Sequence, residues 1–208
     1  SMIRRSLNTF MNAFTSADWT AYPFASQNRT DFFNLLSVYL DATFFANLNP
    51  LDFAQEGIRV ELDNGKPVFK GVVFNEMKGA MSSPNDQLYY RLAHHLYPSS
   101  TYHYNSGGDP AVIPDLTYED LLAFYQTHYH PSNAVFMTFG NLPLAELQAQ
   151  FEEQALNRFD AGRALQSTPE QRFTEPRRVV DGYTLDQENA SGQTFHQLAW
   201  LLPPSTNT

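Results

Sequence analysis

Apolar residues at helical spacing, together with cap signals, predict five helices in this chain. Two begin at recognisable caps: Thr30–Asp31 precedes an apolar stripe, and Thr117 followed by Asp120 has the form of a capping box. The five predicted helices span residues 32–47, 69–81, 86–96, 117–128 and 144–159.

Short runs rich in aromatic and β-branched residues predict the strands. Residues 19–26 contain Pro23, so we expect an edge strand there, because proline cannot donate to a ladder. Such an edge either faces solvent without a ligand or accepts an added strand from a peptide. Asn64–Gly65 lies between two further runs and predicts a hairpin. The remaining predicted strands are residues 134–140, 178–185 and 194–202.

These elements predict an α+β fold, with helices packed on an antiparallel or mixed sheet. Composition turns polar after residue 160, which divides the chain into a domain of residues 1–160 and a linker of residues 161–190. The strand-like run near the end of the chain predicts that residues 191–208 begin a second, truncated domain.

Composition narrows the possible partners and sites. The formal net charge of −9 argues against binding to nucleic acid and to anionic membrane surfaces. The chain has no cysteine, which excludes disulfides and thiolate metal sites. It also has no signal peptide and no apolar run long enough to span a bilayer, so we expect a cytoplasmic protein.

The most informative carboxylate is Glu76, at the centre of the predicted helix of residues 69–81. Helical geometry places apolar and small residues one turn before and after it, so its side of the helix has little polar character. An acid in such surroundings is costly to desolvate unless it is paired or bound to a metal. The alternative to a metal is an ordinary structural partner, a Lys or Arg elsewhere in the chain. The flanking residues are Val72, Val73, Gly79 and Ala80.

The histidines form no recognisable metal-binding motif. The chain contains neither H-E-x-x-H nor H-x-x-E-H, and a catalytic zinc ion needs three convergent protein ligands. We therefore expect structural roles for all of them. A separate metal-binding domain that uses His94, His95 or His103 is the alternative.

Several motifs, in their order along the chain, resemble those of the insulinase/pitrilysin-type zinc metallopeptidases. The later motifs narrow the resemblance to the presequence-protease branch of that family, and the similar region covers roughly residues 3–159. The motifs are Asn12–Ser16, Asp18–Tyr22, Gly71–Gly79, Gly107–Pro110, Tyr129–Asn133 and Phe139–Asn141.

The resemblance implies roles for individual residues. Glu76 matches the position of the family's third zinc ligand, and Asn12, Ala13 and Phe14 match an edge strand that pairs with the substrate backbone. Many relatives carry a further acid one or two turns before the zinc ligand, but this chain has Phe69 seven residues earlier. The family's H-x-x-E-H motif, which supplies two histidine ligands and the general base, is absent from this sequence.

The resemblance therefore implies an internal fragment of a zinc metalloendopeptidase that hydrolyses unstructured peptides. Its fold would be the insulinase-type (processing-peptidase-like) domain, truncated at its N-terminus, with residues 191–208 opening a homologous domain. We expect the chain alone to be inactive and essentially free of zinc, because one carboxylate does not hold the ion. Its expected partners are peptide substrates and the remaining parts of the parent chain. The alternative is a non-catalytic, peptide-binding or structural member of the family.

Overall fold

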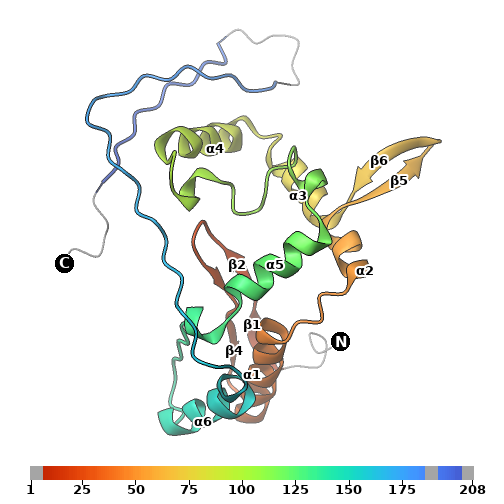
Figure 1. Ribbon diagram of the computed structural model, residues 1–208, viewed down its shortest axis with the longest axis vertical. Coiled ribbons are helices and arrows are strands. Elements are labelled where there is room, and N and C mark those ends of the chain that lie inside the picture. Colours follow the sequence, from red (N-terminus) through yellow and green to blue (C-terminus); the bar gives the residue numbers. More distant parts are fainter. Residues whose placement is uncertain (1–6, 186–191, 203–208) are drawn as a thin grey trace. The chain divides into compact units, whose positions relative to one another are not determined.

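The computed structural model describes residues 7–185 and 192–202, which fold as two compact units (Figure 1). Unit 1 contains β1 to β4, α1, α2, α5 and α6, and unit 2 contains β5, β6, α3 and α4. Both units draw on separate parts of the chain. Unit 1 comprises Ser1–Thr15, Trp19–Phe53 and Leu116–Gln166, and unit 2 comprises Ser16–Asp18, Ala54–Asp115 and Ser167–Thr208.

The strands of unit 1 form two small antiparallel sheets. β1 (Asn8–Met11) pairs with β4 (Phe24–Ser26), and β2 (Phe14–Thr15) pairs with β3 (Thr20–Ala21). The predicted strand of residues 19–26 is therefore divided, and Pro23 stands between its two parts. The carbonyl of Pro23 still accepts a hydrogen bond because proline lacks only the donor.

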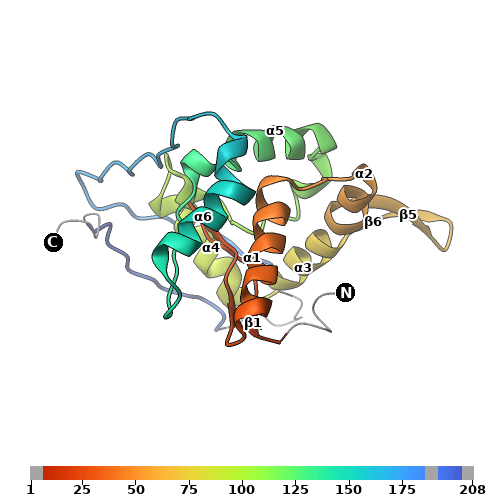
Figure 2. The same cartoon turned by 90° about the horizontal axis from the view of Figure 1, so that it is seen from below.

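The core of unit 1 lies between α1 (Arg29–Phe44) and α6 (Leu144–Gln154), which run beside each other in Figures 1 and 2. α1 begins earlier than predicted because the side chain of Asn28, not Thr30 or Asp31, accepts the N–H of Asp31 as the N-cap. α6 ends at Gln154 and a 3-10 turn follows, so the predicted helix of residues 144–159 is too long. The buried cluster consists of Leu36, Leu40, Phe44, Leu147, Phe151 and Ala155.

α5 (Tyr118–His128) is attached to the C-terminal end of α1 by a tyrosine hydroxyl. Tyr125 donates to the carbonyl of Thr43 at 2.8 Å and accepts the N–H of Ala46 at 3.0 Å. These bonds satisfy backbone groups that the end of a helix leaves without partners. α2 (Pro50–Asp52) follows α1 and continues directly into a π-helical turn, Phe53–Gly57.

Residues 134–140 are extended but pair with no other strand in the described parts of the chain. The prediction that they form a strand of a sheet is therefore wrong. The side chains of this segment nevertheless differ in exposure. Phe136 packs against Phe151 with ring centroids 4.5 Å apart, whereas Val135 and Phe139 are 91% and 105% exposed.

Unit 2 contains the predicted hairpin, β5 (Arg59–Asp63) and β6 (Lys66–Lys70), which extends beyond α3 in Figure 1. Its turn residues Asn64 and Gly65 both have positive φ, the conformation that two-residue hairpin turns require. Phe69 lies in this ladder opposite Val60, so the following helix begins three residues later than predicted.

The helices of unit 2 are α3 (Val72–Ala80) and α4 (Pro84–Leu96). Phe74 and Met77 of α3 are buried against Ile113 and form a smaller core than that of unit 1. Gly107 lies directly against Met77, where a Cβ would come within 2.4 Å of the Met77 sulfur.

The described residues confirm a mixture of helices and antiparallel sheets. They contain three two-stranded sheets, not one sheet covered by helices. Neither of the last two predicted strands, residues 178–185 and 194–202, has a ladder partner within the described residues. Within the described ranges no helix has the length and apolar character needed to cross a membrane.

Candidate functional site

Glu76 lies on the exposed side of α3. Phe74 and Met77 face the core of unit 2, and helical geometry turns Glu76 away from them. Its neighbours one turn earlier, Val72 and Val73, are 52% and 39% exposed. The carboxylate therefore stands beside apolar side chains, as the sequence predicts, but on a surface that is open in this chain.

The structural alternative for Glu76 was a Lys or Arg partner. No hydrogen bond or salt bridge to its carboxylate occurs among residues 7–185 and 192–202. Gly79, one turn later on the same side, would have nothing within 4 Å of an added Cβ. The surface at Gly79 is therefore open, and Glu76 is itself exposed.

The described residues do not make a zinc site by themselves. They contain no group of three His, Asp or Glu side chains placed to hold a metal ion. A protein zinc site needs three or four such ligands, so Glu76 would be one of several, and the others would have to come from outside these residues.

The histidines of unit 2 are engaged with one another and with protein groups. The rings of His94 and His103 lie 3.9 Å apart between centroids, and burial together with these neighbouring rings lowers the pKa of His94. His103 Nδ1 lies 3.2 Å from the carbonyl of Tyr97, and His95 Nε2 lies 2.9 Å from Asp181. These contacts agree with structural roles.

Of the candidate substrate-pairing residues, Asn12 and Ala13 lie between β1 and β2 of unit 1, and Phe14 is the first residue of β2. The N–H of Asn12 donates to the carbonyl of Pro23 at 3.1 Å, which continues the pairing of β1 with β4. The N–H of Ala13 donates instead to the side-chain oxygen of Asn12 at 2.8 Å. Phe14 is 44% exposed, and its ring stacks on Phe10 at 6.3 Å.

This arrangement leaves an edge that another strand can extend. Each sheet of unit 1 has two strands, so within the described residues β1 and β2 have a partner on one side only. An incoming backbone carbonyl could replace the Asn12 side chain as the acceptor for the Ala13 N–H. Glu76 belongs to unit 2, whereas Asn12, Ala13 and Phe14 belong to unit 1.

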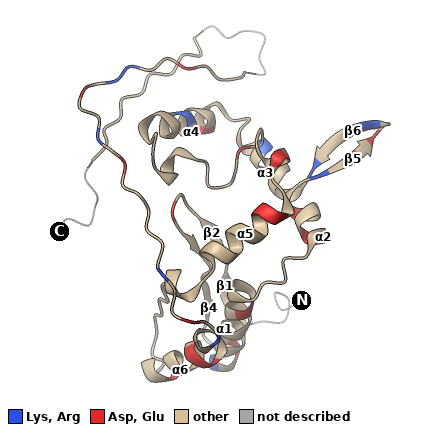
Figure 3. Ribbon diagram, viewed as in Figure 1, with Lys and Arg blue, Asp and Glu red and all other residues tan. Residues whose placement is uncertain are grey.

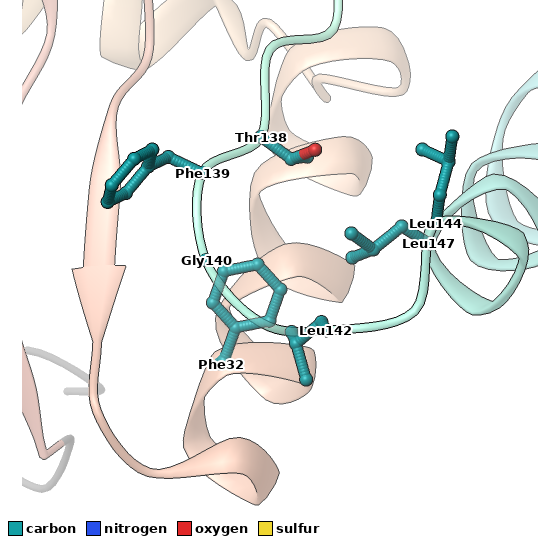
Figure 4. Close-up of a pocket in the computed structure, with 7 residues that line it drawn as sticks. All are labelled: Phe32, Thr138, Phe139, Gly140, Leu142, Leu144 and Leu147. Carbon is teal, nitrogen blue, oxygen red and sulfur yellow. The ribbon is translucent and has the colours of Figure 1, made fainter.

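A pocket in unit 1 lies between the start of α1, the extended segment and α6 (Figure 4). Its volume is about 180 Å³, and the side chains that line it are apolar except for that of Thr138. A wall without titratable groups offers packing but no acid–base chemistry. The lining residues are Phe32, Thr138, Phe139, Gly140, Leu142, Leu144 and Leu147.

Sequence reasoning missed a set of polar contacts made by residues 167–184. Glu170 and Asp181 in this stretch bind groups of unit 2 that precede them by 70 residues or more. Composition predicted a linker there, and no local pattern distinguishes a bound acid from a solvated one. Only the tertiary structure reveals these partners.

Comparison with known proteins places the chain among peptidases. A sequence model described as "Peptidase M16 inactive domain" matches residues 115–208. Similar curated proteins are each called "Presequence protease, mitochondrial": that of Xenopus laevis is 48% identical and that of Mus musculus 46% identical, each over 100% of this chain. The protein of that name from Schizosaccharomyces pombe is 45% identical over 99% of the chain.

The same comparisons correct one expectation. The names of these relatives place them in mitochondria, so the prediction of a cytoplasmic protein is wrong. The chain spans 21% of the length of each of these relatives, about a fifth of it. With nearly half of its residues identical along its whole length, the chain belongs to the M16, insulinase-type family of peptidases, in the presequence-protease branch.

Proposed function

We propose that this chain is part of a mitochondrial zinc metalloendopeptidase that hydrolyses unstructured peptides. In this proposal Glu76 is the third zinc ligand, and Asn12, Ala13 and Phe14 form the edge on which the peptide lies. The observation that carries it is the position of Glu76: an exposed carboxylate on an apolar helix face, without an ionic partner in the described residues, in a chain 48% identical to a presequence protease.

The role proposed for Glu76 is to bind the metal, not to transfer a proton. α3 fixes the direction of the side chain, because its other face is anchored in the core by Phe74 and Met77. A rigid helix holds a ligand more accurately than a loop does. The remaining ligands belong to other parts of the whole protein.

The role proposed for residues 12–14 is to orient the peptide. Main-chain hydrogen bonds to an added strand depend little on the substrate's sequence, so they suit a peptidase that accepts varied extended peptides. The exposed ring of Phe14 offers an apolar contact to a substrate side chain next to those bonds.

The test removes the carboxylate charge from the whole protein that contains this chain. Glu76→Gln keeps the size of the side chain but weakens it as a ligand. We expect zinc content to fall well below one ion per protein and kcat/KM to fall at least about 100-fold. Both are measurable, by metal analysis and by cleavage of an unstructured fluorogenic peptide.

Glu119→Gln is the matched control, because Glu119 is an exposed acid in the first turn of α5. It should leave zinc content and activity unchanged. A Glu76→Gln protein that keeps both full zinc and full activity would remove Glu76 from the metal site.

For the chain alone we propose neither stoichiometric zinc nor peptidase activity. The described residues offer no three-ligand group, and the sequence contains no H-x-x-E-H. Zinc bound at one ion per chain at micromolar concentration, or peptide cleavage that a chelator abolishes, would contradict this part of the proposal.

A second candidate is a non-catalytic, peptide-binding or structural member of the family. The match of residues 115–208 to a domain described as inactive favours it. The sequence of the whole protein distinguishes the two candidates, because the enzyme requires an H-x-x-E-H motif and the binding protein does not. On the second candidate, Glu76→Gln would leave peptide binding unchanged.

A further inference from the structure

Residues 167–184, here called the strap, run along α4 in the opposite direction within unit 2. At the N-terminal end of α4, the buried side chain of Gln87 accepts the N–H of Thr184 at 3.2 Å and donates to its carbonyl at 3.4 Å. One turn further along, Arg91 donates to both carboxylate oxygens of Asp181 at 3.1 Å, and His95 contacts the same carboxylate.

The third attachment lies just beyond the C-terminal end of α4, where Glu170 binds Ser99 and Ser100. The N–H groups of both serines donate to Oε2 of Glu170 at 3.0 Å, and the Ser99 hydroxyl donates to Oε1 at 2.6 Å. The N–H of Gln171 also donates to Oε1, at 3.1 Å. Two adjacent backbone donors and a hydroxyl thus converge on one carboxylate.

The chemistry of these donors selects an anion. Hydrogen bonds from backbone N–H groups to an ionised oxygen are stronger than those to a neutral one. The bond from the Ser99 hydroxyl, followed by the contributions of the Ser99 N–H, of Ser100 and of the Gln171 N–H, lowers the pKa of Glu170 to about 2. The site therefore stabilises the charged form of the carboxylate.

Ser100 carries a second indication of a ligand site. The residue is only 5% exposed, and its hydroxyl has no hydrogen-bond partner in the described parts of the chain. A buried hydroxyl without a partner costs free energy and calls for an explanation. The N–H of this same residue binds Glu170, so the Ser100 hydroxyl lies next to the carboxylate site without a hydrogen bond of its own.

We propose that Ser99 and Ser100 form a carboxylate-binding site that Glu170 occupies from within the chain, and that a carboxylate on another molecule binds there when the strap leaves. Glu170 acts as a tethered ligand. Its attachment through Asp181 and Thr184 keeps it at a high effective concentration near the site, so a free carboxylate competes poorly until Glu170 is removed.

The strap carries acidic and basic residues in alternation, visible as red and blue segments of the long extended trace in Figure 3. Glu175 is the useful comparison, because it lies between the two anchored acids, is exposed, and makes no hydrogen bond or ion pair with any described residue. Removing Glu175 changes the charge of the strap as much as removing Glu170 does, but leaves the serine site filled.

The first experiment titrates the ¹⁵N-labelled full chain with sodium acetate and follows the amide signals of Ser99 and Ser100. We expect Glu170→Ala to give saturable shifts with an apparent Kd on the order of 10 mM. The unchanged chain and Glu175→Ala should bind acetate at least about tenfold more weakly, because Glu170 fills the site. Sodium chloride at equal ionic strength should shift neither signal.

Two results would overturn the proposal: absence of saturable shifts in Glu170→Ala, and equal acetate affinities in all three proteins. Two capped peptides then distinguish the sources of the carboxylate. One carries an internal glutamate and a C-terminal amide, and the other carries only a free C-terminal carboxylate. Binding of either peptide to Glu170→Ala supports the site, and binding of neither contradicts it.

The second experiment measures how often the strap leaves. Trypsin cleaves after arginine, and the strap contains Arg172, Arg177 and Arg178. We expect Glu170→Ala to raise the cleavage rate at these positions about threefold to tenfold, since local opening sets the rate. Glu175→Ala should leave it unchanged. Equal cleavage of the two variants would show that Glu170 does not hold the strap. Neither experiment depends on metal or peptidase activity, so their outcome is separate from that of Glu76→Gln.

Discussion

Different interactions stabilise the interior of each of the two units. Unit 1 has a buried cluster of six apolar residues contributed mainly by α1 and α6, with aromatic rings packed around it. Unit 2 has a cluster of three, Phe74, Met77 and Ile113. Unit 2 adds polar attachments between the strap and α4, made by Glu170, Asp181 and Gln87.

This difference predicts different weaknesses. Apolar burial stabilises unit 1 without regard to protonation, so its sensitive positions are large core side chains. Unit 2 depends on close backbone approach and on ionised carboxylates, so it should respond to small steric changes and to acid. The predictions below test this contrast, and the largest expected effect comes first.

The largest effect should come from the core of unit 1. Phe151 is 9% exposed and its ring lies 4.5 Å from that of Phe136, so Phe151→Ala leaves a cavity that neighbouring rings cannot readily fill. We expect a loss of about 3–5 kcal/mol in the free energy of unfolding. Urea denaturation followed by circular dichroism measures it. Phe139→Ala, at a side chain that is 105% exposed, should cost less than about 0.5 kcal/mol. Similar losses for the two variants would show that burial is not what holds unit 1.

The next effect concerns a close backbone approach in unit 2. A Cβ on Gly71 would lie 2.0 Å from the carbonyl oxygen of Gly57, which is a backbone atom and cannot rotate away. We expect Gly71→Ala to cost about 2–3 kcal/mol. Gly79→Ala has open space around its Cβ in α3 and should stabilise the helix by up to about 1 kcal/mol. The same denaturation experiment gives both values. An unchanged free energy of unfolding in Gly71→Ala would show that the segments containing Gly57 and Gly71 can move apart without cost.

Local signals predicted the parts of the fold whose determinants lie close together in the sequence. The capping box is present in full, because Asp120 N–H donates to the Thr117 hydroxyl and Thr117 N–H donates to Asp120. The Asn64–Gly65 turn forms as predicted because those residues accept positive φ.

The errors arise where distant residues decide the structure. Phe69 lies close in sequence to the residues of α3, but it pairs with β5 and is therefore part of strand β6. Residues 134–140 have the aromatic and β-branched composition of a strand, yet a strand exists only when another backbone lies beside it, and sequence does not show whether one does.

The candidate site likewise has features that local sequence predicts and features that depend on distant residues. Helical periodicity alone predicted that Glu76 shares its side of α3 with Val72 and Val73, and the structure has them together on one exposed face. Its role as a zinc ligand remains a prediction, because the other ligands would come from outside the described residues. The bound state of Glu170 was not predictable, since its serine partners lie about 70 positions earlier in the chain.

The smallest effect should be the response of the strap to acid. Hydrogen bonds from Ser99 hold the pKa of Glu170 at about 2, and the bond with His95, followed by those from Gly182 and Arg91, holds the pKa of Asp181 at about 2. Both values lie below the ordinary range near about 4. A carboxylate with a lowered pKa in the folded state stabilises that state fully above its unfolded pKa, and the contribution disappears as pH falls toward the folded value.

The stabilisation from these two acids should therefore be complete above about pH 5 and lost between about pH 4 and pH 2. The test compares the unchanged chain with the double variant Glu170→Gln, Asp181→Asn, by urea denaturation at half-unit steps from pH 6 to pH 2. Titrating groups that do not contact Glu170 or Asp181 behave alike in both proteins, so their effect cancels in the difference. The difference in free energy of unfolding between the two proteins should be constant at the high-pH end of this range and fall toward zero at the low-pH end. A difference independent of pH would mean that the two carboxylates hold the strap no better than neutral amides do, and the contrast between the units would then rest on Gly71 alone.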